Sequence, residues 1–337
     1  RDTRLAGSAG PLGLYVHIPF CSRKCRYCDF TSFPGRGGSI PRYLAALEAE
    51  ARLVRLLRLP ETLYIGGGTP SELSAAQIGE LFAVIRRSYP QALFSETTFE
   101  ANPESVDAEK LEVLRRAGVT RLSLGLQAWD DALLQDSGRR HTTRDFLQAY
   151  RAARRIGGFS LSVDLIFGLP GQTLAGFIES LARALGLEPE HLSLYGLEMH
   201  EGTPLAASGF VPDEDEGRAM FEAAIDLVTA GGFVHYEISN FARPGHESRH
   251  NLNYWNGGEY MGLGCAAASH LAGERSRNAT DLDDYLRRVE GGERPTVETE
   301  RLEGKDKLGE RVFLGLRRIV GLDLEPAIES EFGGEWE

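Results

Sequence analysis

The sequence predicts an α/β protein built on a parallel sheet, and three observations support this. Strand-like runs rich in Leu, Ile, Val, Tyr and Phe alternate with segments of helical periodicity about six times between residues 12 and 199. Polar or glycine-rich residues follow these runs, as they do at the carboxyl edge of barrel enzymes. The alternation stops near Pro212. A doubly wound open sheet also fits the alternation, but the polar strand ends favour a barrel-like arrangement.

The elements of this pattern follow one another in a regular order. The strand-like runs are residues 12–20, 62–70, 94–103, 120–127, 161–170 and 191–199. Apolar residues recur at helical spacing in residues 43–57, 75–87, 108–117, 130–136, 143–156 and 174–185. Because successive strands of such units are parallel, we expect right-handed crossovers between them.

A smaller α+β region is expected to follow the barrel. We place the barrel domain at residues 12–210 and the second region at residues 211–337, with the boundary between 209 and 216. After the acidic run PDEDEG, residues 218–229 have helical spacing, and the strand-like run 233–239 follows a Gly231-Gly232 turn. Residues 281–289 and 307–318 also look helical.

Composition excludes two classes of partner. The 337 residues include 37 Lys and Arg against 49 Asp and Glu, a net charge of −12. Nucleic-acid binding needs a basic surface, so we expect no nucleic-acid partner. No apolar run is long enough for a transmembrane helix, and residues 1–10 lack an apolar signal core. We therefore expect a cytoplasmic protein without an integral membrane segment.

Three of the four cysteines form a ligand cluster. Cys21, Cys25 and Cys28 lie within the run FCSRKCRYCDF, whereas Cys265 lies far along the chain. A secreted disulfide framework would spread its cysteines through a short chain. Grouped thiolates instead select zinc, Cu(I) or an iron–sulfur cluster.

The identity of the fourth ligand separates two hypotheses. A structural zinc site has four protein ligands, and His17, four residues before Cys21, is the candidate for a Cys3His site. An iron–sulfur cluster with three cysteines leaves one iron without a protein ligand. That open position accepts a small molecule, as at a catalytic zinc. The spacing, the strand-like run before Cys21 and the aromatic Tyr27 favour the iron–sulfur cluster.

The run YVHIPFCSRKCRYCDF resembles the cluster loop of the radical S-adenosylmethionine (SAM) superfamily, with its spacing Cys-x3-Cys-x2-Cys. From Leu14 to about Gly321 the chain is similar to the oxygen-independent coproporphyrinogen dehydrogenase branch. The resemblance implies a partial (β/α)6 TIM-like barrel. It also implies a [4Fe–4S] cluster on Cys21, Cys25 and Cys28 with SAM on the open iron, and reductive cleavage of SAM to methionine and a 5′-deoxyadenosyl radical.

The same resemblance assigns SAM-binding roles to residues near the strand ends. Gly66 to Thr69 follow the second strand, where glycines serve a tight turn or a close approach to a ligand. Asp164 interrupts an apolar run, and a buried charge needs a partner. A guanidinium suits a carboxylate, and the family pattern selects Arg139 rather than Arg140 for that of SAM. The implied set is Tyr15, Tyr27, Gly67, Gly68, Thr69, Glu100, Gln127, Arg139 and Asp164.

Three features favour the haem chaperones of this branch over its decarboxylases. The decarboxylases carry another cysteine two positions after the third ligand, where this chain has Phe30. They also carry an amino-terminal extension, whereas 14 residues precede Tyr15 here. The run HNLNYW, residues 250–255, matches the HNxxYW signature of the chaperones. The alternatives are an oxygen-independent coproporphyrinogen III dehydrogenase and a radical enzyme with an unrelated substrate.

The HNxxYW signature implies haem binding through His250. A histidine in a polar loop is more often a surface or hydrogen-bonding residue, but with the whole signature present we predict an axial haem ligand. We also predict that Tyr254 and Trp255 lie against the macrocycle. Cys265 is either a second ligand or a small buried residue. Weaker candidates are His235, His246 and His270.

The resemblance further implies that haem is cargo, delivered to haem-accepting proteins such as respiratory or iron-storage haemoproteins. Such acceptors imply transient membrane contact. The carboxyl-terminal module is expected to be shorter than in the related chaperones. Turnover of a dedicated substrate stays open, because SAM cleavage does not require one.

Overall fold

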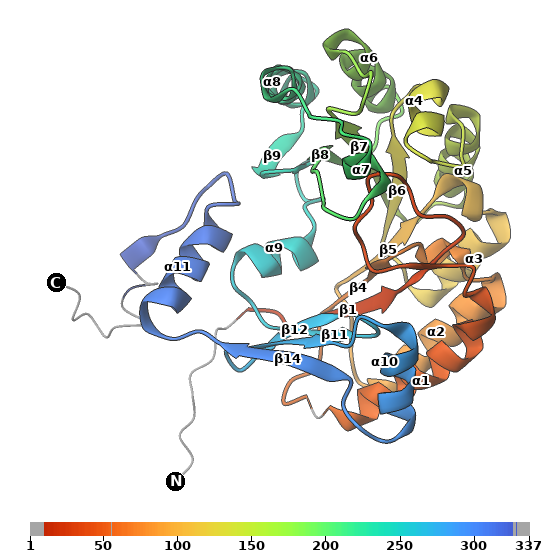
Figure 1. Cartoon of the computed structure of the whole chain (residues 1–337), viewed down its shortest axis with the longest axis vertical. Helices are drawn as coiled ribbons and strands as arrows, with labels where there is room; N and C mark the ends of the chain where they lie inside the picture. Colours follow the sequence, from red (N-terminus) through yellow and green to blue (C-terminus); the bar gives the residue numbers. More distant parts are fainter. Residues whose placement is uncertain (1–9, 55, 326–327, 329–337) are drawn as a thin grey trace.

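One sheet of twelve strands organises the residues that the computed structural model describes, which are 10–54, 56–325 and 328 (Figure 1). Its six central strands are parallel and follow chain order: β1 (Gly13–Ile18), β4 (Thr62–Gly67), β5 (Glu96–Ala101), β6 (Arg121–Gln127), β7 (Ser160–Phe167) and β8 (His191–Gly196). A doubly wound sheet reverses its strand order at a switch point. These six strands show no reversal, and β1 does not pair with β8. The predicted partial (β/α)6 barrel is confirmed.

Helices connect these strands and cover the outer face of the sheet (Figure 1). They are α1 (Ile40–Leu53), α2 (Ala75–Ser88), α3 (Ala108–Ala117), α4 (Asp131–Asp136), α5 (Thr143–Ile156) and α6 (Leu174–Leu185), with 3-10 turns η1 (Gly37–Ser39), η2 (Pro70–Glu72) and η3 (Pro103–Ser105). Most begin at a side-chain oxygen that accepts a hydrogen bond from the first turn. These N-caps are Ser74, Asp107, Asp130, Thr142 and Thr173. Helix α1 ends at Leu53 rather than at the predicted residue 57, because Val54 is extended.

Each central strand has an apolar outer face and a polar inner face. In β1, Leu14, Val16 and Ile18 are buried in the core beneath the helices, whereas Tyr15 and His17 alternate with them. The alternate positions of the other strands are largely polar: Thr62, Tyr64, Glu96, Thr98, Glu100, Arg121, Ser123, Ser160, Ser162, Asp164, His191, Ser193 and Tyr195. Val, Ile and Leu usually fill a TIM barrel. This barrel instead encloses polar groups, which need hydrogen-bond partners or ligands.

The segments after the predicted boundary extend both edges of the same sheet. Beyond β8 lie β10 (Asn240–Ala242) and β9 (Val234–Glu237), and beside β1 lies the parallel β11 (Tyr260–Leu263). Antiparallel β12 (Ala268–Leu271), β13 (Glu274–Asn278) and β14 (Thr296–Arg301) follow β11. The helices of this part are α7 (Pro204–Ala207), α8 (Glu214–Ala230), α9 (Arg249–Trp255), α10 (Leu282–Glu290) and α11 (Gly304–Gly315).

A buried carboxylate joins the barrel to the later segments. Glu50 of α1 accepts hydrogen bonds from Tyr285 of α10 at 2.7 Å, from the Asn278 side chain at 2.6 Å and from the Gly264 backbone at 2.8 Å. Burial raises the pKa of Glu50 to about 7. The barrel and the carboxyl-terminal segments therefore share one core. Among the described residues, no helix has the length and apolar character needed to cross a bilayer.

Candidate functional site

The cysteine loop is fixed at both ends and at its middle. Strands β2 (Phe20–Cys21) and β3 (Phe33–Pro34) pair in parallel and close the loop that carries the three cysteines. At the centre of the loop, the Arg26 backbone N–H donates to the Ser137 carbonyl at 3.0 Å. The Arg26 carbonyl accepts a hydrogen bond from the Leu205 backbone N–H at 2.9 Å. The loop is therefore anchored to the segment after α4 and to α7.

A cavity of about 380 Å³ lies between this loop and the carboxyl ends of β4 to β8. This size is within the usual range of about 300–1,000 Å³ for small-molecule sites. We call it the carboxyl-end cavity. Predicted site residues that line it are Cys21, Cys25, Tyr27, Cys28, Gly67, Gly68, Thr69, Glu100, Gln127, Arg139 and Asp164. Residues far apart in the sequence thus meet at the edge where parallel strands place ligands.

Two of the three thiols have polar side-chain neighbours within this cavity. Cys21 Sγ lies 3.2 Å from Thr69 Oγ1, and an Arg139 N–H points to Cys25 Sγ at 3.9 Å. Burial raises the pKa of Cys28 to about 11 and also raises that of Cys21. Without metal, Cys21 and Cys28 are therefore thiols at neutral pH, so metal binding there must release protons.

The zinc alternative finds little support in this geometry. Within the described ranges, no three or more His, Cys, Asp or Glu side chains converge as ligands of a single ion. His17 is occupied on both ring nitrogens, by the Tyr15 hydroxyl at 2.9 Å and the Thr31 carbonyl at 2.9 Å, and it lines a different cavity. An iron–sulfur cluster distributes its thiolates over separate irons, so they need not converge.

Two glycines allow the backbone at the end of β4 to lie close to β1 and to the cysteine loop. Gly67 has φ +115°, and a Cβ there would lie 2.8 Å from the His17 ring. A Cβ on Gly68 would lie 2.9 Å from the Phe20 carbonyl and 3.1 Å from Cys21 Sγ. A side chain at Gly67 would displace the His17 ring of β1, and one at Gly68 would displace the cysteine loop, so both glycines are required for the close approach of these segments.

Two carboxylates are held at the floor of the cavity. Glu100 accepts hydrogen bonds from the Tyr64 hydroxyl at 2.6 Å and from the Gly67 backbone at 3.2 Å. The Ser123 hydroxyl donates to Asp164 at 2.7 Å. Burial raises the pKa of Glu100 to about 7 and also raises that of Asp164. Hydrogen bonds from hydroxyl or ammonium groups of a ligand would stabilise both carboxylates.

Arg139 provides a cation with unused hydrogen-bonding capacity. Its NH2 group donates to Asn102 Oδ1 at 2.8 Å and to the Gly125 carbonyl at 3.0 Å. Its Nε is buried without a partner among the described residues. Gln127, at a bulge of β6, has φ 69°, a conformation that re-aims its side chain. An anionic group in the cavity would satisfy Arg139.

Tyr15 does not line the carboxyl-end cavity, whereas other residues that the sequence motifs did not indicate do line it. Tyr15 lines the cavity that His17 also lines, and does not contribute to the carboxyl-end cavity. The added wall residues include Asn102, Ser123 and Tyr195. Ser123 and Tyr195 lie on the polar inner face of β6 and β8, so strand alternation is the signal that could have found them.

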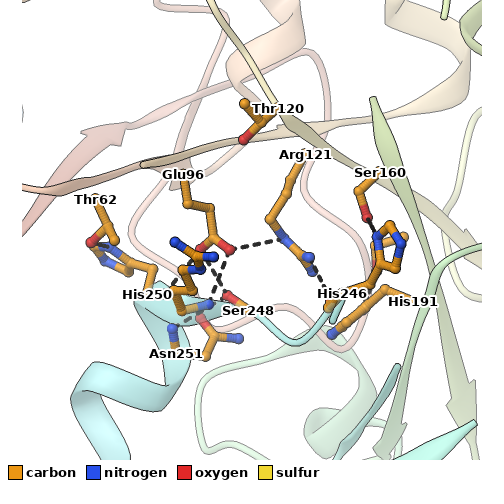
Figure 2. Close-up of polar contacts among 12 residues, drawn as sticks. Thr62, Glu96, Thr120, Arg121, Ser160, His191, His246, Ser248, His250 and Asn251 are labelled. Carbon is orange, nitrogen blue, oxygen red and sulfur yellow. Dashed lines mark hydrogen bonds and ion pairs between the residues drawn. The ribbon is translucent and has the colours of Figure 1, made fainter. Parts of the chain in front are cut away.

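His250 lies at the opposite end of the barrel, beside the first residue of β4, and on helix α9 rather than in the polar loop that we expected. Figure 2 shows His250 next to Thr62. Its side chain is fully buried at 0% exposure. Nδ1 lies 2.9 Å from Thr62 Oγ1, and Nε2 lies 2.8 Å from the Tyr254 hydroxyl. Burial lowers the pKa of His250 to about 3, so the ring is neutral.

Glu96 anchors the start of α9 at this amino end (Figure 2). It accepts backbone N–H groups of Arg249 at 3.0 Å and His250 at 2.9 Å, and lies 3.8 Å from Arg121 Nε. Arg121 also donates to the His246 carbonyl at 2.6 Å. The positive end of the helix and the guanidinium both stabilise the buried carboxylate. The network therefore holds α9 against the first residues of β4, β5 and β6.

The remaining haem candidates are dispersed. His246 Nδ1 lies 3.1 Å from Ser160 Oγ, and His235 stacks on Phe241 with ring centroids 4.1 Å apart. Cys265 is buried at 0% exposure, with Sγ 3.2 Å from the Ala279 carbonyl. Tyr254, Trp255 and His270 line the cavity beside α9. Both ring nitrogens of His250 are occupied, so iron ligation there requires loss of one hydrogen bond and stays a prediction.

Comparisons with known proteins agree with this arrangement. A family model described as the radical SAM superfamily matches residues 15–184. The chain is 38% identical over 317 residues to the heme chaperone HemW of Bacillus subtilis (strain 168), covering 91% of this chain and 84% of that protein. It is 37% identical over 327 residues to HemW of Lactococcus lactis subsp. lactis (strain IL1403), covering 96% and 85%. The solved structure of Escherichia coli coproporphyrinogen III oxidase HemN, a radical SAM enzyme, has a TM-score of 0.83 at 27% identity, covering 96% of this chain and 80% of that one.

Proposed function

Since this chain belongs to the HemW family of the radical SAM superfamily, we propose that it is a haem chaperone that binds haem and transfers it to acceptor haemoproteins. The observation that carries this function is sequence similarity to HemW proteins along almost the whole chain, at 38% identity over 91% of its length. The cofactors of this protein are a [4Fe–4S] cluster and SAM. Respiratory and iron-storage haemoproteins are the acceptors that we propose.

The residues of the carboxyl-end cavity fit these two cofactors. Cys21, Cys25 and Cys28 would hold the cluster, which supplies an electron to the sulfonium of SAM when both are bound. The orphaned Nε of Arg139 would pair with the SAM carboxylate. Glu100 would accept hydrogen bonds from polar groups of SAM. Gly68 leaves room where a Cβ would meet Cys21 Sγ at 3.1 Å.

The chaperone function is tested with anaerobically purified protein that has been reconstituted with iron and sulfide. We expect stoichiometric binding of haemin and its transfer to an apo-haemoprotein, followed by the absorption spectrum of the acceptor. A matched sample of free haemin at the same concentration measures spontaneous transfer. Binding without transfer above that control would contradict the chaperone function.

Oxygen-independent coproporphyrinogen III dehydrogenase is the second candidate, because the HemN structure matches with a TM-score of 0.83. Phe30 is the feature that separates the two, since the decarboxylases resembled by this chain have a cysteine at that position. Its side chain is 62% exposed at the rim of the carboxyl-end cavity. Anaerobic incubation with coproporphyrinogen, SAM and a reductant distinguishes them. A decarboxylated product would favour the dehydrogenase, and its absence with intact haem transfer would favour the chaperone.

A further inference from the structure

A second cavity lies beside the HNxxYW segment and is separate from the carboxyl-end cavity. It has a volume of about 350 Å³ and lies between α9, β11 to β13 and α11. We call it the α9–α11 cavity. Its walls include Tyr254, Trp255, Tyr260, His270, Arg275 and Leu314. A smaller cavity of about 40 Å³ shares Gly257, His270, Arg275 and Leu314 with it, so the two adjoin. Figure 1 shows α9 and α11 beside this edge of the sheet.

The walls combine aromatic surfaces with unsatisfied polar groups. Tyr254 and Tyr260 meet edge-to-face with ring centroids 4.6 Å apart, and Trp255 adds a third ring. Trp255 Nε1 is buried without a partner among the described residues, and so is Nε of Arg311, which lines the smaller cavity. Aromatic walls suit a flat apolar ligand, and the unsatisfied N–H groups suit carboxylates on that ligand.

His270 is the histidine of this region with a ring nitrogen free to bind metal. Its Nδ1 lies 3.2 Å from the Gly258 carbonyl, which only accepts hydrogen bonds, so Nδ1 carries the proton. The neutral ring then leaves a lone pair on Nε2, for which no described residue provides a hydrogen bond. A backbone carbonyl on the far nitrogen is the usual support of a metal-binding histidine. Burial lowers the pKa of His270, which keeps the ring neutral.

The other two nearby histidines differ from His270 in this respect. His17 is hydrogen-bonded on both nitrogens, to Tyr15 and Thr31, and His250 is hydrogen-bonded on both, to Thr62 and Tyr254. His250 is also fully buried and does not line the cavity. Iron binding at either would break an existing bond, whereas at His270 it would not.

We propose that the cargo haem binds in the α9–α11 cavity, with Nε2 of His270 as axial ligand of the iron and Arg275 and Arg311 facing its propionates. This inference rests on the proposed chaperone function. Arg275 already pairs with Glu310 at 2.6 Å, so a propionate would share or replace that carboxylate. Within the signature, His250 positions Tyr254 through their hydrogen bond, and Tyr254 with Trp255 forms the wall.

Titration of the reconstituted protein with haemin, followed by the Soret band, tests the ligand. We expect His270→Ala to weaken binding roughly tenfold or more and to shift the band, because loss of even an outer-shell partner of a metal ligand costs about 10–100-fold in metal affinity. Added imidazole should restore the band. His235→Ala is the matched control, and it should bind as the wild type does. His250→Gln disturbs the cavity wall through Tyr254, so it should weaken binding without shifting the Soret band, because the axial ligand is retained.

The outcomes separate this inference from the function on which it rests. Wild-type protein that binds no haemin would overturn the proposed function. Wild-type affinity and spectrum in His270→Ala, or loss of the axial band in His250→Gln with His270 intact, would overturn the assignment to His270. Cluster iron content and circular dichroism of each variant establish that its fold is retained.

A second titration tests the propionate contacts. Wild-type protein should bind haemin more tightly than haemin dimethyl ester, and Arg311→Gln should reduce this preference. An unchanged preference in Arg311→Gln would overturn the role of that guanidinium.

Discussion

The two ends of the barrel use the same kinds of side chain in different ways. At the amino end, Glu96 accepts two backbone N–H groups, Arg121 pairs with Glu96 and donates to a backbone carbonyl, and both ring nitrogens of His250 are hydrogen-bonded (Figure 2). At the carboxyl end, Arg139 keeps an unpartnered Nε, and burial raises the pKa of Glu100. A network whose polar groups all have protein partners stabilises the fold, whereas groups without protein partners are available to bind a ligand.

The largest expected effect is at the carboxyl end. Cys25→Ser should abolish the cluster, because a hydroxyl does not replace a thiolate on iron. Iron and sulfide analysis after anaerobic reconstitution measures this. Cys265→Ser is the matched control and should keep full iron content, since its side chain lies in the core against the Ala279 carbonyl. Equal iron content in the two variants would refute the cluster assignment.

The next effect concerns the amino end. Glu96→Gln should lower the free energy of unfolding by about 3–5 kcal/mol, because it leaves the buried Arg121 unpaired. Urea denaturation measures the loss. Glu179→Gln breaks an exposed pair with Arg183 and should cost less than about 1 kcal/mol. Similar losses in both variants would contradict the stabilising role of the amino-end network.

Arg139→Gln is expected to change ligand affinity more than stability. A lost charge-assisted hydrogen bond is worth about 1.5–3 kcal/mol, so affinity for SAM should fall roughly 10–100-fold. Calorimetric titration of the cluster-loaded protein measures this, with the neighbouring Arg140→Gln as control. Unchanged affinity in Arg139→Gln would remove this residue from the SAM site.

The smallest effect is a pH dependence of stability. The pKa of Glu100 is raised from 4.5 to about 7 by burial, so the folded state holds its proton more tightly than the unfolded chain. The free energy of unfolding should therefore fall as pH rises from about 4.5 to about 7. Without SAM at pH 8, Glu100→Gln should be more stable than wild type by about 1–2 kcal/mol, since a weaker Tyr64 bond offsets part of the gain. Denaturation of both proteins at pH 5 and pH 8 measures this difference. The same difference in free energy of unfolding between Glu100→Gln and wild type at both pH values would contradict the prediction.

The sequence predicted the carboxyl end far better than the amino end. The cysteine spacing, the glycine run and the polar residues at strand ends are local patterns, and the parallel order of the strands brings them together. The role of His250 depends on contacts with Thr62 and Glu96, which are 188 and 154 positions away in the chain. No local pattern reveals such partners. The segment that forms α9, which packs against the first residues of β4, β5 and β6, was therefore expected to be a polar loop.

Strand alternation held information beyond these motifs. Tyr15 and His17 occupy inner-face positions of β1, as Ser123 does in β6. Alternation identifies which face a residue occupies but not its height along the barrel. The family resemblance implied a SAM contact for Tyr15, which lines the α9–α11 cavity and not the carboxyl-end cavity.

Sequential titration of one reconstituted sample with SAM and then haemin tests most directly that the two ligands occupy separate sites. We predict that each ligand binds at one site, that neither displaces the other, and that cluster iron stays constant throughout. Release of SAM by haemin, or haemin binding only after removal of the cluster, would contradict it.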